Sequence, residues 1–423
     1  MIYYCSVDGG NSTINIVING KKVRRFFPSI QSDPLPAKAS YANAAWGKDS
    51  STNLWNKLHV ETTLNMDKPN EFFRSEFLFG HMAEEYQKDL RSRDNKEKYQ
   101  DKDLAKWMIT SLAYSLFENR VQNENYKLKN NDKLQFNIIL ATGLPYREAK
   151  DAEKRSSWEN IFKGVHRVEF KHPLFKGLTV DLVIEGAHAF VEAEMALTLE
   201  LNKDGGIFET TKAEDLLNKK MAIIDIGGHT TEVVTIAYEA IQNDDDDYDE
   251  YDVQERELEV RPVTKIHLTD GIQRGVATIM EDIIVEINNE YQSINKPIKT
   301  LTRRDIELAF TIKGKYDGQV GWILPEKIYV KDMFDRHVEN LAMDIVQKVH
   351  ALYQNNVISE VDTIFLCGGG SRISSVVEII KKQLGALGYN EDKIVSVADP
   401  VFANALGYYF TLTYFYPECE NLS

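Results

Sequence analysis

Two stretches of the chain repeat one pattern, in which an apolar run ends in aspartate and is followed by glycine, a short polar turn and a β-branched run. Residues 221–234 read MAIIDIGGHTTEVV, and residues 7–14 read VDGGNSTI. A tight turn that glycine permits between two apolar runs predicts a β-hairpin in each place. Two copies about half a chain apart predict two domains related by duplication.

Periodicity along the rest of the chain predicts alternating strands and helices. Apolar positions at helical spacing predict long helices over 103–118 and 334–354, and a third that opens at Asp270 and runs through Glu290. The dipeptide Asn19-Gly20 predicts a further hairpin turn. Short apolar runs predict strands at 134–146 and 361–368, and helices are expected at 147–163, 301–309, 375–384 and after Asp399.

Residues 178–192 are divided by Gly186, which predicts one more hairpin. This hairpin would bring Glu192 and Glu194 to the start of a helix at 193–201. The acidic run 243–252 lies between two predicted strands. Its like charges repel one another and bury nothing, so we expect a solvated, mobile loop.

Composition restricts the class of protein. The chain of 423 residues is too long for one compact core, which predicts two or three domains. A hydrophobic content of 43% and a charged content of 27% are typical of soluble globular proteins. No apolar run approaches the roughly 20 residues that cross a bilayer, and the first residues are expected to form a strand, not a signal peptide. Three distant cysteines (Cys5, Cys367 and Cys419) predict neither a disulfide framework nor a zinc site, and they fit a reducing cytoplasm.

The net charge of −15 bears on possible partners. A surface of this sign repels phosphate backbones, so direct binding to nucleic acid is disfavoured. Any link to DNA is expected to need an adaptor or a local basic patch.

The hairpins and one glycine turn carry the candidate chemistry. The tip of each hairpin offers backbone N–H groups and hydroxyls that suit a phosphate, and the aspartate at its root can hold a metal-bound water. Gly368, Gly369 and Gly370 follow a strand and precede a helix. There the backbone can approach a base or a phosphate closely. One hairpin or one glycine turn alone is equally well an ordinary turn, so the prediction depends on their combination.

The order of these pieces resembles the actin-like ATPase superfamily, which includes actin, heat-shock chaperone ATPases and sugar kinases. Within it the chain most resembles the bacterial plasmid-partition actins of the ParM type. The resemblance is carried by the strand end Ala141-Thr142-Gly143-Leu144-Pro145, by the carboxylate just before the first connecting helix, and by the segment 302–306. It implies an α/β actin-like ATPase fold of two related domains, each a mixed sheet flanked by helices, around a central nucleotide cleft.

The resemblance also implies domain boundaries. Domain I would span residues 1–190, with an insertion at about 37–103 that carries little chemistry of its own, and a C-terminal helix at about 400–423 would complete it. Domain II would span residues 191–399. It would contain an acidic loop at about 243–257 and a small subdomain at about 291–357.

The resemblance assigns ATP, or alternatively GTP, with Mg²⁺ to this cleft, and binding would close it by a hinge motion. Asp8 and Asp225 would hold metal-bound waters, and Glu192 would orient or deprotonate the attacking water. Glu194 is the alternative, because a slip of two residues along the strand exchanges the two carboxylates. His229 is either catalytic or a hydrogen-bonding turn residue. The nucleotide-binding residues would be Gly9, Gly10, Asn11 and Ser12 at the β-phosphate, Gly227, Gly228, His229 and Thr230 at the γ-phosphate, and Gly271, Arg274, Asp305, Gly368, Gly369, Gly370 and Arg372 around the adenosine.

One position departs from the family. Many actin-like proteins carry a lysine seven residues after the first aspartate, and this chain carries Asn15 there. Either another cation compensates, or nucleotide affinity and preference differ from those of the relatives.

The implied function is a cytoplasmic ATPase that self-associates into filaments with ATP and Mg²⁺ and depolymerises after hydrolysis. The filaments would segregate plasmid DNA through a ParR-like adaptor, with indirect contact to DNA and none to membrane. The alternatives are a small-molecule kinase of the sugar kinase type, a cell-shape or division actin, and a binding module that does not hydrolyse nucleotide.

Overall fold

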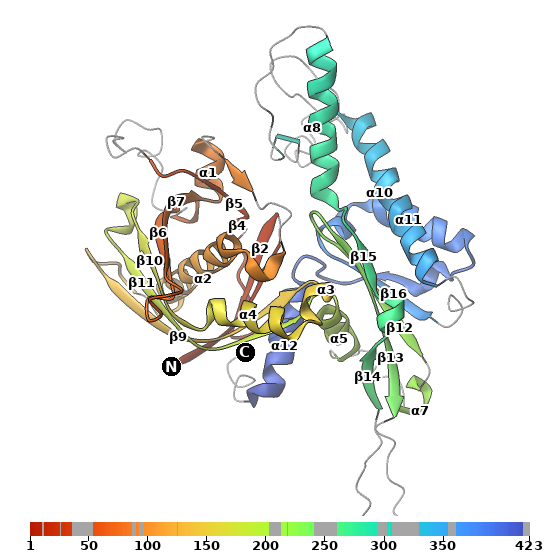
Figure 1. Cartoon of the computed structure of the whole chain (residues 1–423), viewed down its shortest axis with the longest axis horizontal. Coiled ribbons are helices and arrows are strands. Elements are labelled where there is room, and N and C mark those ends of the chain that lie inside the picture. Colours follow the sequence, from red (N-terminus) through yellow and green to blue (C-terminus); the bar gives the residue numbers. More distant parts are fainter. Residues whose placement is uncertain are drawn as a thin grey trace, which may run out of the picture. The chain divides into compact units, whose positions relative to one another are not determined.

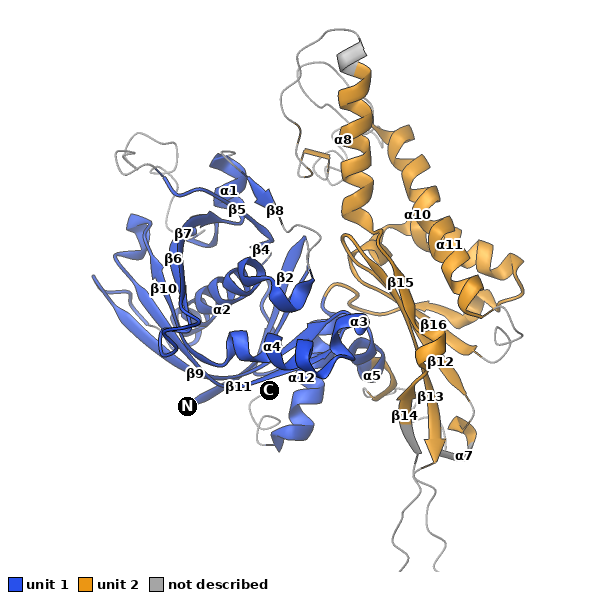
Figure 2. Cartoon of the chain, in the orientation of Figure 1, with its two compact units in different colours: residues 1–199, 402–423 blue, residues 200–401 orange. Residues whose placement is uncertain are grey.

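The computed structural model divides the chain into two compact units, which Figure 2 distinguishes by colour. Unit 1 comprises Met1–Leu199 and Phe402–Ser423, and unit 2 comprises Glu200–Val401. The structure describes residues 1–10, 12–25, 27–35, 54–86, 90–92, 97–124, 126–202, 213–217, 219–240, 260–293, 301, 303, 305–306, 330–353 and 361–417.

The described part of unit 1 contains a mixed sheet of eleven strands, in the order β3-β2-β1-β9-β11-β10-β6-β7-β5-β8, with β4 paired to β2. Strands β1, β9 and β11 are parallel, and most of the other pairs are antiparallel. The strands are β1 (Ile2–Gly9), β2 (Thr13–Ile18), β3 (Lys21–Lys22), β4 (Phe27–Pro28), β5 (Ile30–Ser32), β6 (His59–Leu64), β7 (Phe73–Phe79), β8 (Arg91–Ser92), β9 (Lys133–Leu144), β10 (Gly164–Phe170) and β11 (Thr179–Val191).

Helices cover both faces of the parallel strands of unit 1, because alternate side chains point to opposite faces. On one face, Val7 and Leu140 belong to the same hydrophobic core as Leu104 and Met108 of α2. On the other face, Tyr4 and Ile139 pack with side chains of α12. Figure 1 shows α2 lying along the sheet. The helices are α1 (His81–Tyr86), α2 (Lys102–Asn123), α3 (Tyr146–Ala149), α4 (Ala152–Phe162), α5 (Glu194–Asn202) and α12 (Ala403–Phe415), with short 3-10 helices at Leu54–Asn56, Lys98–Gln100 and Pro173–Phe175.

The described part of unit 2 contains a six-stranded sheet in the order β14-β13-β12-β16-β17, with β15 paired to β13. Helices α8, α10 and α11 pack their apolar faces into one core with this sheet. The elements are α7 (Ala213–Leu216), β12 (Lys220–Ile226), β13 (Thr231–Ala240), β14 (Val260–Thr264), β15 (Asp270–Ile272), α8 (Val276–Ser293), α10 (Lys331–Leu352), β16 (Val361–Cys367), α11 (Ser374–Ala386) and β17 (Ile394–Ser396), with 3-10 helices at Ile266–Leu268, Gly369–Arg372 and Glu391–Lys393.

The two sheets share one topology over five strands. The order β3-β2-β1-β9-β11 in unit 1 corresponds to β14-β13-β12-β16-β17 in unit 2. In each, an antiparallel hairpin is followed by two parallel strands. The units are therefore two related α/β units, each a mixed sheet with flanking helices.

The predicted hairpin over 178–192 is wrong. These residues form the single strand β11, which pairs in parallel with β9 on both sides of Gly186, and the register shifts between Ile184 and Gly186. A glycine inside a strand can mark such an irregularity as well as a turn, and local sequence does not distinguish the two.

Two smaller differences concern helix boundaries. Asp270–Ile272 forms a strand beside β13, and α8 begins only at Val276. Residues 147–163 contain two helices, because Asp151 caps a new helix through hydrogen bonds from the N–H groups of Glu153 and Lys154. The predicted helix at 301–309 and the subdomain at 291–357 lie partly outside the described residues, and the acidic loop at 243–257 lies wholly outside them.

None of the described helices is long and apolar enough to cross a membrane.

Candidate functional site

In unit 1, the predicted site residues lie at one edge of the sheet, where three parallel strands end. Val7 of β1 pairs with Thr142 of β9, and Thr142 pairs with Ala189 of β11. Asp8 therefore follows at the end of β1, and Glu192 directly follows the end of β11. The carboxyl ends of parallel strands are the usual location of ligand sites in open α/β sheets.

The first hairpin, β1–β2, has a tightly closed turn. The N–H of Gly10 donates to the carbonyl of Thr13 at 2.9 Å. The hydroxyl of Ser29 donates to the Gly10 carbonyl at 2.7 Å, and the N–H of Ser29 donates to the Ser12 carbonyl at 3.0 Å. Gly9 ends β1 beside Asp8, which is buried, and the predicted site residue Asn11 lies outside the described residues.

Asn15 occupies a buried position in this hairpin, directly opposite Asp8 in the antiparallel register. It stands where many actin-like proteins carry lysine. The amide places a neutral group beside the Asp8 carboxylate, so the hairpin itself provides no cation at this position.

Glu192 is held by its main chain on both sides. Its N–H donates to the Leu144 carbonyl at 2.9 Å, which extends the pairing of β11 with β9. The next residue, Ala193, has a left-handed backbone with φ of +59°, and its N–H donates to Oδ1 of Asn404 in α12 at 2.9 Å. A left-handed residue other than glycine, asparagine or aspartate is uncommon and is enriched at functional sites.

The two candidate carboxylates have different surroundings. Glu192 forms an ion pair with Lys98, a lysine that the sequence analysis did not single out. Glu194 begins α5, and burial together with the Glu194 charge raises the pKa of Tyr146. The two residues therefore face different neighbours within unit 1.

The second hairpin, β12–β13, repeats the turn of the first. The N–H of Gly227 donates to the carbonyl of Thr230 at 2.9 Å, and Gly227 lies two residues after Asp225. In the first hairpin, Gly10 lies two residues after Asp8 and donates to Thr13 over the same distance. The two copies therefore share their turn geometry as well as their sequence pattern.

The glycine turn after β16 lies directly against the root of this second hairpin. Asp225 pairs with Cys367, which places Gly368 beside the aspartate. Gly368 has a φ of +79°, and a Cβ atom there would overlap Oδ1 of Asp225 and the carbonyl of Ile226. Its N–H donates to the Pro400 carbonyl at 2.9 Å. Gly369 and Gly370 continue the turn, and open space surrounds Gly369, where a ligand can approach the backbone.

Helix α8 begins against the tip of the second hairpin. The N–H groups of Val276 and Ala277 donate to the carbonyls of Gly227 and Gly228, at 3.0 Å and 2.6 Å. A Cβ atom at Gly275 would overlap both carbonyls, so glycine permits this close approach. Gly271 pairs with Glu232 of the same hairpin. The first N–H groups of α8 thus orient the hairpin and are not aimed at a ligand.

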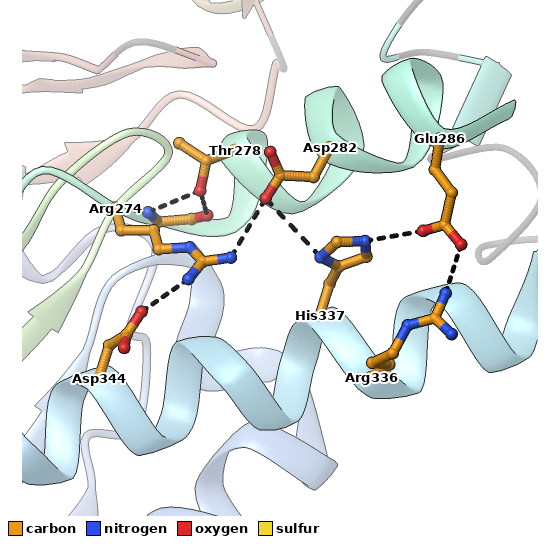
Figure 3. A network of polar contacts seen from close by, with 8 residues as sticks. Arg274, Thr278, Asp282, Glu286, Arg336, His337 and Asp344 are labelled. Atoms are coloured by element: carbon orange, nitrogen blue, oxygen red, sulfur yellow. Dashed lines mark hydrogen bonds and ion pairs between the residues drawn. The ribbon is translucent and has the colours of Figure 1, made fainter. Parts of the chain in front are cut away.

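Arg274 joins the hairpin to two helices. Its carbonyl accepts the hydroxyl of Thr231 at 2.9 Å. Its guanidinium forms ion pairs with Asp344 of α10 at 2.7 Å and with Asp282 of α8 at 3.1 Å. Figure 3 shows these side chains between the two helices. The sequence predicted Arg274 for the adenosine pocket, and the structure gives its side chain a role in helix packing.

His229 is buried in the turn of the second hairpin. Its Nε2 lies 3.0 Å from Oε1 of Glu281, and Arg303 lies 3.7 Å from the same oxygen. The hydrogen bond with His229, together with the nearby Arg303, lowers the pKa of Glu281. The other ring nitrogen, Nδ1, is buried and has no hydrogen-bond partner in the part of the chain that the structure describes.

Two predicted nucleotide-binding residues, Asp305 and Arg372, lie outside the two hairpins. Asp305 is half-buried in a short helical turn, and Arg372 is exposed at the end of the glycine turn. The described residues contain no group of three or more His, Cys, Asp or Glu side chains that could hold a metal ion by themselves. Mg²⁺ is commonly held by one or two carboxylates together with phosphate oxygens and water. Asp8 in unit 1 and Asp225 in unit 2 each provide one carboxylate, which fits that second kind of binding.

Comparisons with known proteins place the fold. No protein-family model matches the sequence, and no curated protein matches it. Among solved structures, pCBH ParM, a non-polymerisable quadruple mutant, is 18% identical with a TM-score of 0.67, and the match covers 98% of this chain and 100% of that one. A 15-stranded ParM filament from Clostridium botulinum is 19% identical with a TM-score of 0.65, covering 97% and 98%. Bacillus thuringiensis ParM with AMPPNP is 16% identical with a TM-score of 0.56, covering 97% and 98%.

These matches extend over nearly the full length of both chains. The chain therefore has the actin-like fold of the ParM structures, and the predicted resemblance to ParM-type proteins is confirmed at the level of the fold.

Proposed function

We propose that this chain is a filament-forming actin-like ATPase that segregates plasmid DNA. The observation that carries the proposal is the repeated hairpin, with an aspartate at its root and the same turn hydrogen bond in each unit. Of the structures with this fold, one is a ParM filament and another is a ParM with AMPPNP. Both support assembly and nucleotide binding as the function of this chain.

In this proposal, Asp8 and Asp225 hold waters of a Mg²⁺ ion that accompanies the nucleotide. The turn of the first hairpin, including Asn11, provides donors to phosphate oxygens, as does the turn from Gly227 to Thr230. The adenosine is proposed to lie near Gly271, Arg274, Asp305 and the turn from Gly368 to Arg372. ATP is the proposed nucleotide and GTP the alternative.

A bound nucleotide would supply the phosphoanhydride and a bound Mg²⁺ would neutralise its charge, and residues of the protein would position the attacking water. We assign this role to Glu192, because its backbone is fixed on both sides and its carboxylate is held by an ion pair. A preorganised carboxylate that orients or deprotonates water contributes about 10²- to 10⁴-fold to a rate. Glu194 remains the alternative.

The first experiment tests nucleotide-dependent assembly. Negative-stain microscopy and light scattering with ATP or GTP, with and without Mg²⁺, should show filaments only when both nucleotide and metal are present. Phosphate release should follow assembly. Absence of filaments at every protein concentration would contradict the cytoskeletal function, and ATP consumption that depends on an added sugar would favour a small-molecule kinase.

The second experiment assigns the residues. Asp225→Asn should abolish phosphate release, because it removes the charge that would hold the metal-bound water. Glu192→Gln should slow phosphate release about 10²-fold or more while filaments still form. Glu194→Gln is the matched control and should retain the wild-type rate. If Glu194→Gln is slow and Glu192→Gln is normal, the role belongs to Glu194.

The third experiment tests the link to DNA. Filaments should sediment with plasmid DNA only when a centromere-binding adaptor of the ParR type is added, because the chain carries a net charge of −15 and repels DNA. In living cells, deletion of the gene that encodes this chain should raise the rate at which the plasmid that carries the gene is lost. If the plasmid is lost at the same rate with and without the gene, the proposed role in segregation is wrong, while the proposed ATPase activity is unaffected.

A further inference from the structure

We propose that Lys98 is a positioning residue for the Glu192 carboxylate in ATP hydrolysis. This inference rests on the proposed function, since it assigns a second residue to the water-orienting group. The Lys98 ammonium and Oε1 of Glu192 form an ion pair across 94 residues of sequence, within unit 1. Lys98 belongs to the segment that the sequence analysis treated as an insertion with little chemistry.

The Lys98–Glu192 ion pair is less exposed to solvent than the ion pairs of the other buried lysines in the described part of unit 1. The Lys98 side chain is 2% exposed and the Glu192 side chain is 16% exposed. Lys57 and Lys106 are also buried, but their acidic partners, Glu85 and Asp103, are 46% and 51% exposed. Removal of a charge from water is costly, and a closely placed opposite charge compensates that cost.

The segment that carries Lys98 is fixed by its neighbours. Glu97 forms an ion pair with Lys154 of α4, whose ammonium also lies 4.9 Å from the centre of the Tyr99 ring. The N–H of Tyr99 donates to Oε2 of Glu148 at 2.9 Å. Asp101 follows and caps α2 by accepting the N–H of Leu104 at 2.9 Å. The ammonium therefore projects from an anchored backbone and does not depend on a flexible loop.

The position of the Glu192 carboxylate has two determinants. Its main chain is fixed by the Leu144 carbonyl and by the left-handed turn at Ala193. Its side chain still has several rotatable bonds, and the ion pair with Lys98 selects one direction among them. The ammonium engages Oε1, and a carboxylate has about four acceptor positions on its two oxygens. The remaining positions are sufficient to accept the hydrogens of a water molecule.

Loss of the ammonium should remove the fixed direction of the Glu192 carboxylate. That loss reduces the rate of hydrolysis and does not require a change in nucleotide binding.

The experiment is a double-mutant cycle on the full chain. Lys98→Met, Glu192→Gln and the double variant are compared by single-turnover phosphate release from pre-bound ATP and Mg²⁺. Nucleotide affinity is measured in parallel, and the unfolding midpoint of each variant confirms folding. Lys98→Arg tests rescue by a second cation, and Lys106→Met is the matched control for loss of a buried lysine. Lys98→Gln replaces Lys98→Met if the methionine variant does not fold.

We expect Lys98→Met to slow phosphate release by about tenfold or more and to change nucleotide affinity by less than about twofold. Lys98→Arg should restore part of the rate. Lys106→Met should keep the wild-type rate. In the Glu192→Gln background, Lys98→Met should have an effect of less than about twofold, because Lys98 acts through Glu192.

Three results would overturn the inference. A wild-type rate in Lys98→Met while Glu192→Gln is slow would make the ion pair a structural contact only, and the proposed function would stand. If Lys98→Met slows phosphate release equally in the wild-type and Glu192→Gln backgrounds and also weakens nucleotide binding, Lys98 contacts the phosphates directly. A wild-type rate in Glu192→Gln would remove the proposed role of Glu192, and the positioning role of Lys98 with it.

Discussion

At the scale of single residues, Gly368 joins two motifs that lie far apart in the sequence. Its backbone is left-handed and lies against the Asp225 carboxylate and the Ile226 carbonyl. A side chain at this position would meet both a conformational penalty and a steric overlap. The glycine turn and the second hairpin can therefore form one site only if residue 368 has no Cβ atom.

We predict that Gly368→Ala destabilises unit 2 and displaces the Asp225 carboxylate. A φ of +79° with a ψ of 168° is a conformation that essentially only glycine adopts, and it costs about 1–3 kcal/mol for another residue. The overlap with Asp225 adds to that cost, and nucleotide affinity should fall as well. Denaturant unfolding without nucleotide and titration with a fluorescent ATP analogue would measure the two effects.

Gly369→Ala is the matched control for stability, because no atom lies within 4 Å of the position that its Cβ would take. Its free energy of unfolding should change by less than about 0.5 kcal/mol. Equal destabilisation of the two variants would contradict the close contact between Gly368 and Asp225.

His166 is a second residue whose environment makes a measurable prediction. It is fully buried in β10, where Nε2 lies 2.6 Å from the Phe162 carbonyl and Nδ1 lies 3.3 Å from the N–H of Asn65. A neutral ring protonated at Nε2 satisfies both contacts. A second proton on Nδ1 would face the Asn65 N–H. Burial lowers the pKa of His166 to about 4.

Unit 1 should therefore lose stability in mild acid. The unfolded chain binds a proton at residue 166 near pH 6.5, and the folded chain binds it only near pH 4. The free energy of unfolding should fall as pH decreases from about 6.5 to about 4, by about 3 kcal/mol from this residue. His172, whose burial lowers its pKa to about 4, acts in the same direction.

Denaturant unfolding followed by tryptophan fluorescence between pH 7 and pH 4 would measure this slope. His166→Gln should have a shallower slope than the wild type, because it removes one of the groups that must take up a proton on unfolding. His267→Gln, at an exposed position, should leave the slope unchanged. The same slope in both variants would assign the acid sensitivity to other groups.

At the scale of elements, α8 and α10 are joined by a row of charged side chains (Figure 3). Arg274 contacts Asp344 and Asp282, and His337 lies between Asp282 and Glu286. Since the carbonyl of Arg274 also accepts the Thr231 hydroxyl, the row connects the second hairpin to α10.

A double-mutant cycle on Arg274→Met and Asp344→Asn should give a coupling free energy of about 1 kcal/mol. The Arg274 and Asp344 side chains are 29% and 39% exposed, so solvent screens part of their attraction. Because the pair belongs to a network of charges, its coupling free energy should lie at the upper end of the range for surface pairs. The matched pair is Lys331 and Asp335, which are half exposed at both ends. Its coupling should be smaller than that of the Arg274 pair. Equal couplings would show that the network adds nothing to the Arg274 pair.

At the scale of the whole molecule, the two units share a sheet topology and a turn geometry. The shared topology supports a duplicated origin for the two hairpins.

The surface charge is a second property at this scale, since a net charge of −15 makes copies of the chain repel one another in solution.

We therefore expect assembly to depend on ionic strength. The Debye length falls from about 30 Å at 0.01 M salt to about 8 Å at 0.15 M, which screens repulsion between monomers. The critical concentration for filament formation, measured by sedimentation with ATP and Mg²⁺, should decrease as monovalent salt rises through this range. A variant in which the seven acidic residues of 243–252 are replaced by their amides should show a weaker dependence. A critical concentration that rises with salt would indicate that attractive ion pairs dominate the interface.

The sequence by itself determined the local features of this protein. Apolar periodicity and glycine positions predict the two hairpins with their tight turns, the strands that end near Asp8 and Asp225, and most of the long helices, because these signals act over a few neighbouring residues. The order of these elements was sufficient to predict the actin-like fold. The candidate residues at the hairpin roots and the glycine turn were found in the same way.

Only the tertiary structure decided which distant residues meet. Gly186 marks a shift of register within one strand, because pairing with β9 continues on both sides of it. Lys98 reaches Glu192, and Arg274 turns toward α8 and α10. Such contacts depend on sheet order and on register, and a change of one residue in register moves every side chain of a strand to the other face. Local sequence patterns do not contain that information, because the partners lie many residues apart.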